Sequence, residues 1–214
     1  MGSSSVPDES EQYVDDARFR IPFDLFVSKK QKNGILGSGS CIRFNDSCGN
    51  LVFKVERPPP PNSRDQKSAA TFHQNPPIKL IFNASGNTLF CIRKLTDGSW
   101  QGFRVTDSRE ELMFRVQKTV DKLTRTEFEI FLIGEESEDS KTDFKMRGSP
   151  FKRSCTIYKG NSIMAETSLM YKMGIQKAFV PRSRFRVTIF PGHIDLALVV
   201  SLVVIFFDGR KLWI

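Results

Sequence analysis

The chain has 214 residues, 39% of them hydrophobic and 26% charged, a composition that excludes wholesale disorder and suits one large domain or two small ones. Its 32 Lys and Arg against 24 Asp and Glu give a formal net charge of +8. Such a charge favours an anionic partner, either nucleic acid or an anionic lipid surface, although basic side chains that simply face water would produce the same excess. The 19 Phe against 3 Tyr and 2 Trp indicate a large, dry core.

The N-terminal region differs in charge from the rest of the chain. Residues 1–16 contain five acidic residues and no base, so the remainder carries +13. We expect a disordered acidic tail over 1–18, one domain over 19–207 and a short C-terminal tail over 208–214. No secretory signal sequence opens the chain, and four cysteines are too few to staple a domain of this size. These features predict a reducing compartment, the cytoplasm or the nucleus.

Short runs of alternating apolar and polar residues follow one another along the domain. In 51–56, Phe53 and Val55 point to one side and Lys54 and Glu56 to the other, as in a half-buried strand. Comparable runs predict strands at 19–27, 41–44, 79–82, 89–94, 100–105, 112–118, 128–133, 144–148, 154–158, 163–166 and 185–189. Eleven or twelve short strands with turn signals between most neighbours predict a β-sandwich or β-barrel.

The connections also carry signals. Asn33-Gly34 is a hairpin signal, the prolines at 58–61 open an exposed loop that reaches about residue 74, and 135–143 form an acidic loop. The pattern Phe-Asn…Gly-Asn occurs at 44–50 and again at 82–87. This weak internal repeat predicts two similar hairpins.

One segment near the C-terminus breaks the rhythm of short strands. Residues 196–207 contain only one polar residue, Ser201, with Asp195 as a candidate N-cap and Asp208-Gly209 as a stop signal. The many Val and Ile residues leave a buried central strand as an alternative, but a helix over 195–207 is favoured. The segment is too short to span a membrane and apolar on every side, so the simplest place to bury it is inside a closed β-barrel.

The sequence nominates no catalytic group, metal site or cofactor site. Only His73 and His193 could serve as imidazole bases, and no cysteine belongs to a C-x-x-C pair. The Gly-rich stretch 34–39 lacks the Gly-Lys-Ser/Thr of a phosphate-binding loop and precedes a strand. We therefore expect a protein that is not an enzyme and uses no cofactor. We also expect it to be a monomer.

Two basic features remain as candidates for binding. Bases recur on the outward faces of the predicted strands, and the stretch 167–194 contains several bases and no acid. Together they give ten candidate contacts for an anionic lipid head group: Lys54, Arg93, Lys94, Arg104, Arg115, Lys172, Lys177, Arg182, Arg184 and Arg186. The alternative is an ordinary barrel exterior, which is charged because it faces water. Nucleic acid is disfavoured because binding it calls for exposed aromatics, whereas the Phe residues alternate inward.

The order of the motifs resembles the plant LURP-one-related family (LOR), whose relatives are the tubby C-terminal domain and the phospholipid scramblases. The resemblance runs over about residues 20–207 and depends on the following residues in this order: Asp46, Gly49–Val55, Phe82, Ser85–Asn87, Leu89, Trp100, Phe103, Cys155, Ile157, Gly160, Ile163, Ala165, Glu166, Phe185, Val187, Ile189, Pro191, Gly192 and the apolar run. Two stretches depart from the family pattern. Residues 192–195 are one residue longer, and residues 208–214 stand where the family usually continues with an acidic tail.

The resemblance implies a closed antiparallel barrel of about twelve strands around a hydrophobic C-terminal helix. It also implies a role in plant defence and no enzyme activity. Tubby-like domains bind phosphoinositides through basic residues of the barrel, which implies reversible attachment to the plasma membrane. A nuclear module that binds proteins or acts in transcription is the alternative, with unknown protein partners in either case. Lipid scrambling is disfavoured because no segment is long enough to span a bilayer.

Overall fold

The computed structural model describes residues 21–31, 40–57, 79–106, 109–122, 124–134, 142–170, 184–192 and 194–208. Within these ranges it contains twelve β-strands and one α-helix. In chain order they are β1 (Phe23–Gln31), β2 (Ser40–Asn45), β3 (Leu51–Glu56), β4 (Lys79–Asn83), β5 (Thr88–Lys94), β6 (Trp100–Thr106), β7 (Arg109–Asp121), β8 (Thr126–Leu132), β9 (Phe144–Ser149), β10 (Ser154–Lys159), β11 (Ser162–Leu169), β12 (Phe185–Ile189) and α2 (Leu196–Asp208).

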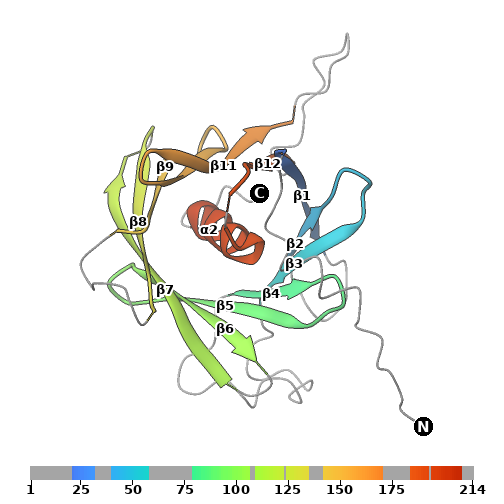
Figure 1. Cartoon of the computed structure of the whole chain (residues 1–214), viewed down its shortest axis with the longest axis horizontal. Helices are drawn as coiled ribbons and strands as arrows, with labels where there is room; N and C mark the ends of the chain where they lie inside the picture. Colours follow the sequence, from blue (N-terminus) through green and yellow to red (C-terminus); the bar gives the residue numbers. More distant parts are fainter. Residues whose placement is uncertain are drawn as a thin grey trace.

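The strands form a closed antiparallel barrel (Figure 1). Each strand pairs with the next along the chain, and β1 closes the ring by pairing with β12, with Phe23 opposite Ile189 and Val27 opposite Phe185. Closure leaves no strand edge exposed for pairing with another chain. The predicted barrel of about twelve strands is confirmed. The Asn33-Gly34 turn, the proline-rich loop and most of the acidic loop lie outside the described residues.

The two hairpins predicted from the internal repeat have the same backbone geometry. In each, the first turn residue donates its N–H to the carbonyl four residues later, and its side chain accepts a bond from that later residue: Asp46 with Asn50, and Asn83 with Asn87, both at 2.8 Å. Gly49 and Gly86 have φ of 88° and 90°, a conformation that favours glycine. The backbone bonds recur in the turn that begins at Leu95, so this turn occurs three times among the described residues.

The apolar segment forms a helix and not a strand, and α2 runs through the centre of the barrel (Figure 1). Asp195 caps its start, because its Oδ1 accepts a hydrogen bond from the Ala197 N–H at 2.7 Å. Every residue from Ala197 to Phe207 is buried. The one polar side chain among them, Ser201, donates its hydroxyl to the Ala197 carbonyl at 2.7 Å, so this hydroxyl has a partner inside the core.

Aromatic rings join the helix to the wall of the barrel. The Phe206 ring packs against Phe128 of β8 with centroids 5.8 Å apart, and the Phe207 ring lies 5.0 Å from Phe185 of β12. The expectation that the Phe residues alternate inward holds only in part. The partly buried Phe82 ring lies on the outer face 4.9 Å from the Lys54 Nζ, because residues 54 and 82 are register partners.

Gly102 makes room for a core ring and provides a test of how tightly the barrel is packed. A Cβ at this position would lie 2.0 Å from the buried Phe114 ring, so we expect Gly102→Ala to destabilise the fold by about 1–3 kcal/mol through overpacking. A Cβ at Gly134 meets no atom within 4 Å, so Gly134→Ala should change stability by less than about 0.5 kcal/mol. Urea denaturation of both variants checks this, and equal midpoints would contradict the packing described.

Candidate functional site

The two ends of the barrel differ because the central helix is directional. Asp195 and the start of α2 lie at one end, and Asp208 closes α2 at the other. Lys79, the first residue of β4, forms an ion pair with Asp208, and Phe185, the first residue of β12, packs against Phe207. In an antiparallel barrel, alternate strand ends then meet at the Asp208 end. This end is termed the basic end.

Positive charge collects at the basic end. Among the described residues that run from the last residue of one strand to the first residue of the next at this end, together with Asp208, eight Lys or Arg stand against four Asp or Glu, a net charge of +4. The bases are Arg57, Lys79, Lys94, Lys122, Arg125, Lys152, Arg153 and Arg184. The acids are Glu56, Asp97, Asp121 and Asp208. Such an excess attracts anions over roughly one Debye length, about 8 Å at physiological salt.

Part of this charge serves the fold. The Lys79 side chain is only 5% exposed, and burial lowers the pKa of its ammonium, opposed by the neighbouring Asp208 carboxylate. The Arg57 guanidinium lies 3.9 Å from the same carboxylate. These residues line a pocket of about 200 Å³ together with Lys29 and Glu56. The C-terminal carbonyls of a helix favour a nearby cation, but the last turn of α2 contains no base. The surrounding barrel supplies these cations instead.

Other cations at this end lie over aromatic rings of the barrel interior. The Lys94 Nζ is 5.4 Å from the centroid of the Trp100 ring, and the Lys118 Nζ is 5.7 Å from that of Phe128. The Arg153 guanidinium is 5.6 Å from the Phe207 ring. These distances allow cation–π attraction, which fixes each charge above the apolar core.

A larger groove of about 640 Å³ lies beside β7. It is lined by Asp97–Ser99 of the β5–β6 turn, Arg115–Lys118 of β7 and Phe131–Ile133. Its volume falls within the usual range for small-molecule sites, about 300–1,000 Å³. Its charge is largely compensated, because Lys118 pairs with Asp121 at 3.1 Å. Asp97 is engaged within its own turn, since its Oδ1 accepts bonds from the Ser99 hydroxyl and N–H, which lower the pKa of its carboxyl.

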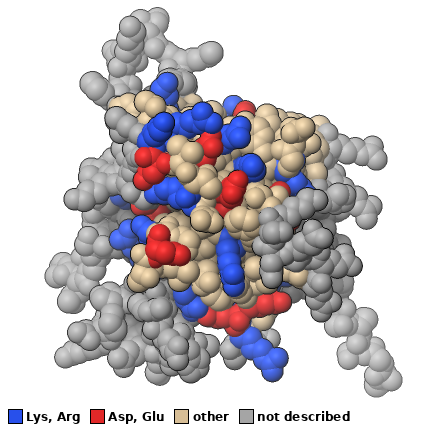
Figure 2. All heavy atoms as spheres, turned by 90° about the vertical axis from the view of Figure 1, so that its left-hand side faces the viewer, with Lys and Arg blue, Asp and Glu red and all other residues tan. Residues whose placement is uncertain are grey.

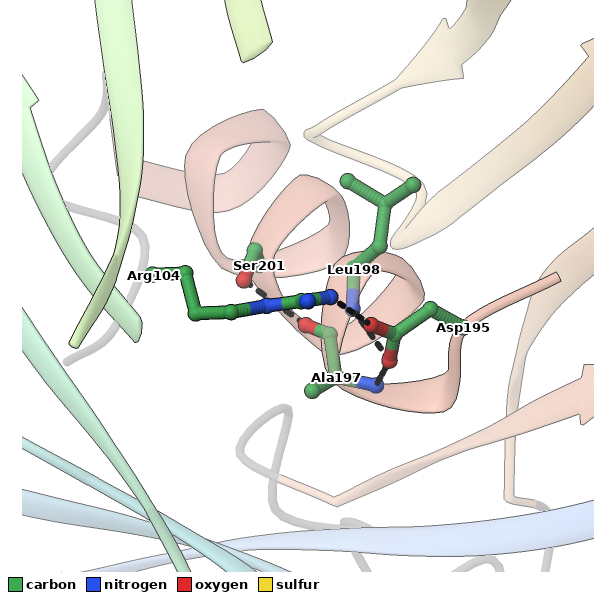
Figure 3. Close-up of polar contacts among 5 residues, drawn as sticks. All are labelled: Arg104, Asp195, Ala197, Leu198 and Ser201. Atoms are coloured by element: carbon green, nitrogen blue, oxygen red, sulfur yellow. Dashed lines mark hydrogen bonds and ion pairs between the residues drawn. The ribbon is translucent and has the colours of Figure 1, made fainter. Parts of the chain in front are cut away.

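A partly exposed ion pair lies at the opposite end of the barrel. Arg104 of β6 reaches across the start of α2 to the Asp195 carboxylate at 3.5 Å, while Asp195 also caps the helix (Figure 3). Both groups are therefore engaged in holding the helix, which leaves Arg104 less suited to bind a partner.

The structure separates the ten candidate bases into three groups. Lys54, Arg93, Arg104 and Arg186 form ion pairs with Glu56, Glu110, Asp195 and Asp24 respectively. Lys94, Arg115 and Arg184 are exposed and form no ion pair with any described residue, and Arg115 lines the 640 Å³ groove. Lys172, Lys177 and Arg182 lie outside the described residues. Of the described candidates, only Lys94 and Arg184 belong to the basic end.

Ion pairing also patterns the barrel wall. Figure 2 shows basic and acidic side chains interleaved on the face formed by β7, β8 and β9. Glu127 of β8 lies between Arg125 and Arg147, and Glu129 lies 3.3 Å from Lys145. Cross-strand pairs of this kind are worth little individually, but they neutralise the wall.

Two of the buried thiols, Cys91 and Cys155, are unsuited to a reactive site. Burial raises the pKa of the Cys91 thiol to about 12, and burial also raises that of Cys155. A thiol of such high pKa is a poor nucleophile and a poor metal ligand at neutral pH. Both histidines lie outside the described residues.

Comparison with known proteins identifies the family. The family model described as LURP-one-related matches residues 23–208, which span the whole barrel and its helix. The chain belongs to the LURP-one-related family. Protein LURP-one-related 7 of Arabidopsis thaliana is 40% identical to it over 191 residues, covering 89% of this chain and 91% of the relative. Protein LURP-one-related 15 of the same plant is 28% identical over 98% of this chain and 92% of its own, and Protein LURP1 is 25% identical over 76% and 73%.

The resemblance predicted from the ordered motifs is thus confirmed for this LURP-one-related chain. In the part of the chain that the structure describes, no helix is both long enough and apolar enough to cross a membrane.

Sequence reasoning overlooked the basic end as a unit. Lys79 and Asp208 were visible only as a strand start and a helix stop, and Lys152 only as a turn residue. Strand polarity in a closed antiparallel barrel could have grouped them, because it assigns every turn to one of two ends. The alternation of side chains along a strand shows which bases face outward, but it does not show which strand ends lie together.

The ion pair between Lys79 and Asp208 gives a prediction for stability. Lys79→Met removes the closest partner of a mostly buried carboxylate, so we expect a loss of up to about 3 kcal/mol, moderated by Arg57. The double variant Lys79→Met/Asp208→Leu should recover most of that loss, because both charges are then absent. Urea denaturation of the single and double variants measures this, and additive losses would contradict the coupling.

The pH dependence provides an internal check on the same pair. The folded pKa of Lys79 lies below its ordinary value of 10.5, so the unfolded state holds the proton more tightly. The Lys79 contribution to stability therefore rises with pH up to about that value. In Lys79→Met this part of the slope should vanish.

Proposed function

We propose that this protein is a non-enzymatic LURP-one-related barrel that binds the anionic, phosphoinositide-bearing face of a membrane reversibly and acts in plant defence signalling. The observation that carries the proposal is the net charge of +4 at the basic end. Each base close to an anionic bilayer contributes about 1 kcal/mol, so a few uncompensated charges suffice for reversible attachment.

Three residues are best placed to supply this attraction. Lys94, Lys152 and Arg184 are exposed at the basic end and form no ion pair with a described residue. Bases that already pair with an acid gain less from a lipid phosphate, because the acid opposes the approach. Lys79 and Arg57 are committed to Asp208 in this way.

The proposed mode of binding is a charged surface and not one deep pocket. The 640 Å³ groove offers one uncompensated base, Arg115, because Lys118 has its own acid. The 200 Å³ pocket lies over the Lys79–Asp208 ion pair. A surface mode implies modest affinity with strong salt dependence, since the attraction is long-ranged and screened.

A nuclear module that binds proteins or acts in transcription is the competing proposal. It draws on the partly buried aromatic rings under outward cations, such as Phe82 under Lys54 and Phe103 under Arg93, which contact cations on the barrel wall. The two proposals assign recognition to different surfaces, the wall in one case and the basic end in the other.

Charge reversal at the basic end separates these proposals. We expect the triple variant Lys94→Glu, Lys152→Glu, Arg184→Glu to reduce binding to vesicles containing phosphatidylinositol bisphosphate by more than tenfold, on the basis of about 1 kcal/mol per base. Flotation at low and at physiological salt measures this, and wild-type binding should fall as salt rises. Phosphatidylcholine vesicles serve as the neutral-lipid comparison.

A matched control changes the same charge elsewhere. Arg109, Lys145 and Lys159 are exposed and lie on strands towards the opposite end, so their reversal to Glu gives the same change in net charge. This control should bind nearly as wild type. If both triple variants lose binding to the same extent, only the net charge matters and the basic end is not the binding surface. If the wild-type protein floats with neither kind of vesicle, the proposal is contradicted.

A further inference from the structure

An exposed phenylalanine occupies the tip of a turn at the basic end. The turn Pro150–Arg153 links β9 to β10, and the Arg153 N–H donates to the Pro150 carbonyl at 3.3 Å. Phe151 is 51% exposed, and Lys152 beside it is also exposed. Met170 follows directly after β11, the strand that pairs with β10, and is 37% exposed. Of the exposed large apolar side chains among the described residues, these two lie at the basic end.

The turn is held rigidly from below. The Arg153 side chain is 1% exposed over the Phe207 ring, so it ties the turn to the end of α2. The Arg153 carbonyl accepts a hydrogen bond from the Thr167 hydroxyl at 3.0 Å, and that hydroxyl oxygen accepts from the Cys155 N–H at 2.8 Å. Arg153 has φ of 56°, which the buried contacts of its side chain and backbone stabilise.

The strand before the turn is equally constrained. Gly148 pairs with Cys155, and a Cβ at residue 148 would lie 2.0 Å from the Ser154 carbonyl oxygen. The hairpin therefore approaches its partner strand as closely as the backbone allows. A turn fixed in this way presents Phe151 without an ordering cost when it meets a partner.

We propose that Phe151, supported by Met170, inserts into the interface of an anionic bilayer while Lys152 and Arg184 contact lipid phosphates. The inference rests on the proposed function and deepens it by assigning the membrane-facing tip and hence the orientation of the barrel, with the C-terminal end of α2 towards the lipid. Phe at a membrane interface buries its ring among acyl chains, and flanking Lys side chains keep their charge at the head groups.

A bilayer fits this tip better than a protein groove does. Among the described residues, the exposed large apolar side chains at this end are Phe151 and Met170, and the exposed charge next to Phe151 in the sequence, Lys152, is positive. Stable protein interfaces bury an extended patch of mixed polarity, about 800 Å² per partner. A fluid anionic surface requires only a protruding apolar side chain and a positive rim.

Fluorescence quenching tests the insertion directly. The variant Phe151→Trp is made with Trp213→Phe, so that the only other indole is Trp100, which is 2% exposed inside the barrel. Vesicles of phosphatidylcholine with phosphatidylinositol bisphosphate carry bromine on their acyl chains. We expect quenching and a blue shift of the emission of the introduced indole on binding. Unchanged emission from the bound protein would overturn the insertion.

Matched apolar variants give a second readout. Phe151→Ala should bind the same vesicles about tenfold more weakly, whereas Phe151→Leu retains most of the affinity. Ile163, 42% exposed at the other end of the barrel, provides the control, and Ile163→Ala should bind as wild type. Charge-dependent binding without quenching and without an effect of Phe151→Ala would overturn the insertion and leave the proposed function standing. Absence of binding by the wild type would overturn both.

Discussion

The helix that is apolar on every side is the constraint on which the rest of the structure depends. A segment from Ala197 to Phe207 with no polar face cannot lie on a surface, so it must be enclosed. A closed ring of twelve strands is wide enough to enclose a helix, and its inward-facing side chains must then match the helix in shape and polarity. This requirement accounts for the surplus of Phe over Tyr, because a hydroxyl inside the barrel would need a partner there.

Enclosing the helix also determines the character of the two ends of the barrel. At its start, Asp195 satisfies the first N–H groups and Arg104 balances the charge of Asp195. At its end, α2 has no base of its own, and Lys79 and Arg153 come from the surrounding strands and turns. Some of the positive charge at the basic end is therefore a consequence of the fold. The remainder, on exposed side chains such as Lys152, is what a partner could recognise.

Much of the fold could be predicted from the sequence because the periodicity of apolar residues is visible within each short segment. The alternation in 51–56 and the apolar run after Asp195, interrupted only by Ser201, each determine an element, and the hairpins at Asp46 and Asn83 repeat one backbone turn. The candidate site was harder, because an ion pair such as Arg186 with Asp24 joins residues 162 positions apart. Periodicity shows which way a side chain points, but not which strand end lies beside another, and the basic end is a property of that arrangement.

The central claim is that α2 remains inside the barrel while the basic end meets an anionic surface. Hydrogen–deuterium exchange of the full chain, with and without vesicles containing phosphatidylinositol bisphosphate, tests it most directly. We expect slow exchange of the α2 amides in both states, with added protection on lipid binding confined to the turns of the basic end, above all Pro150–Arg153. Fast exchange of α2 in the free protein, or lipid-induced change in α2 with none in those turns, would contradict it.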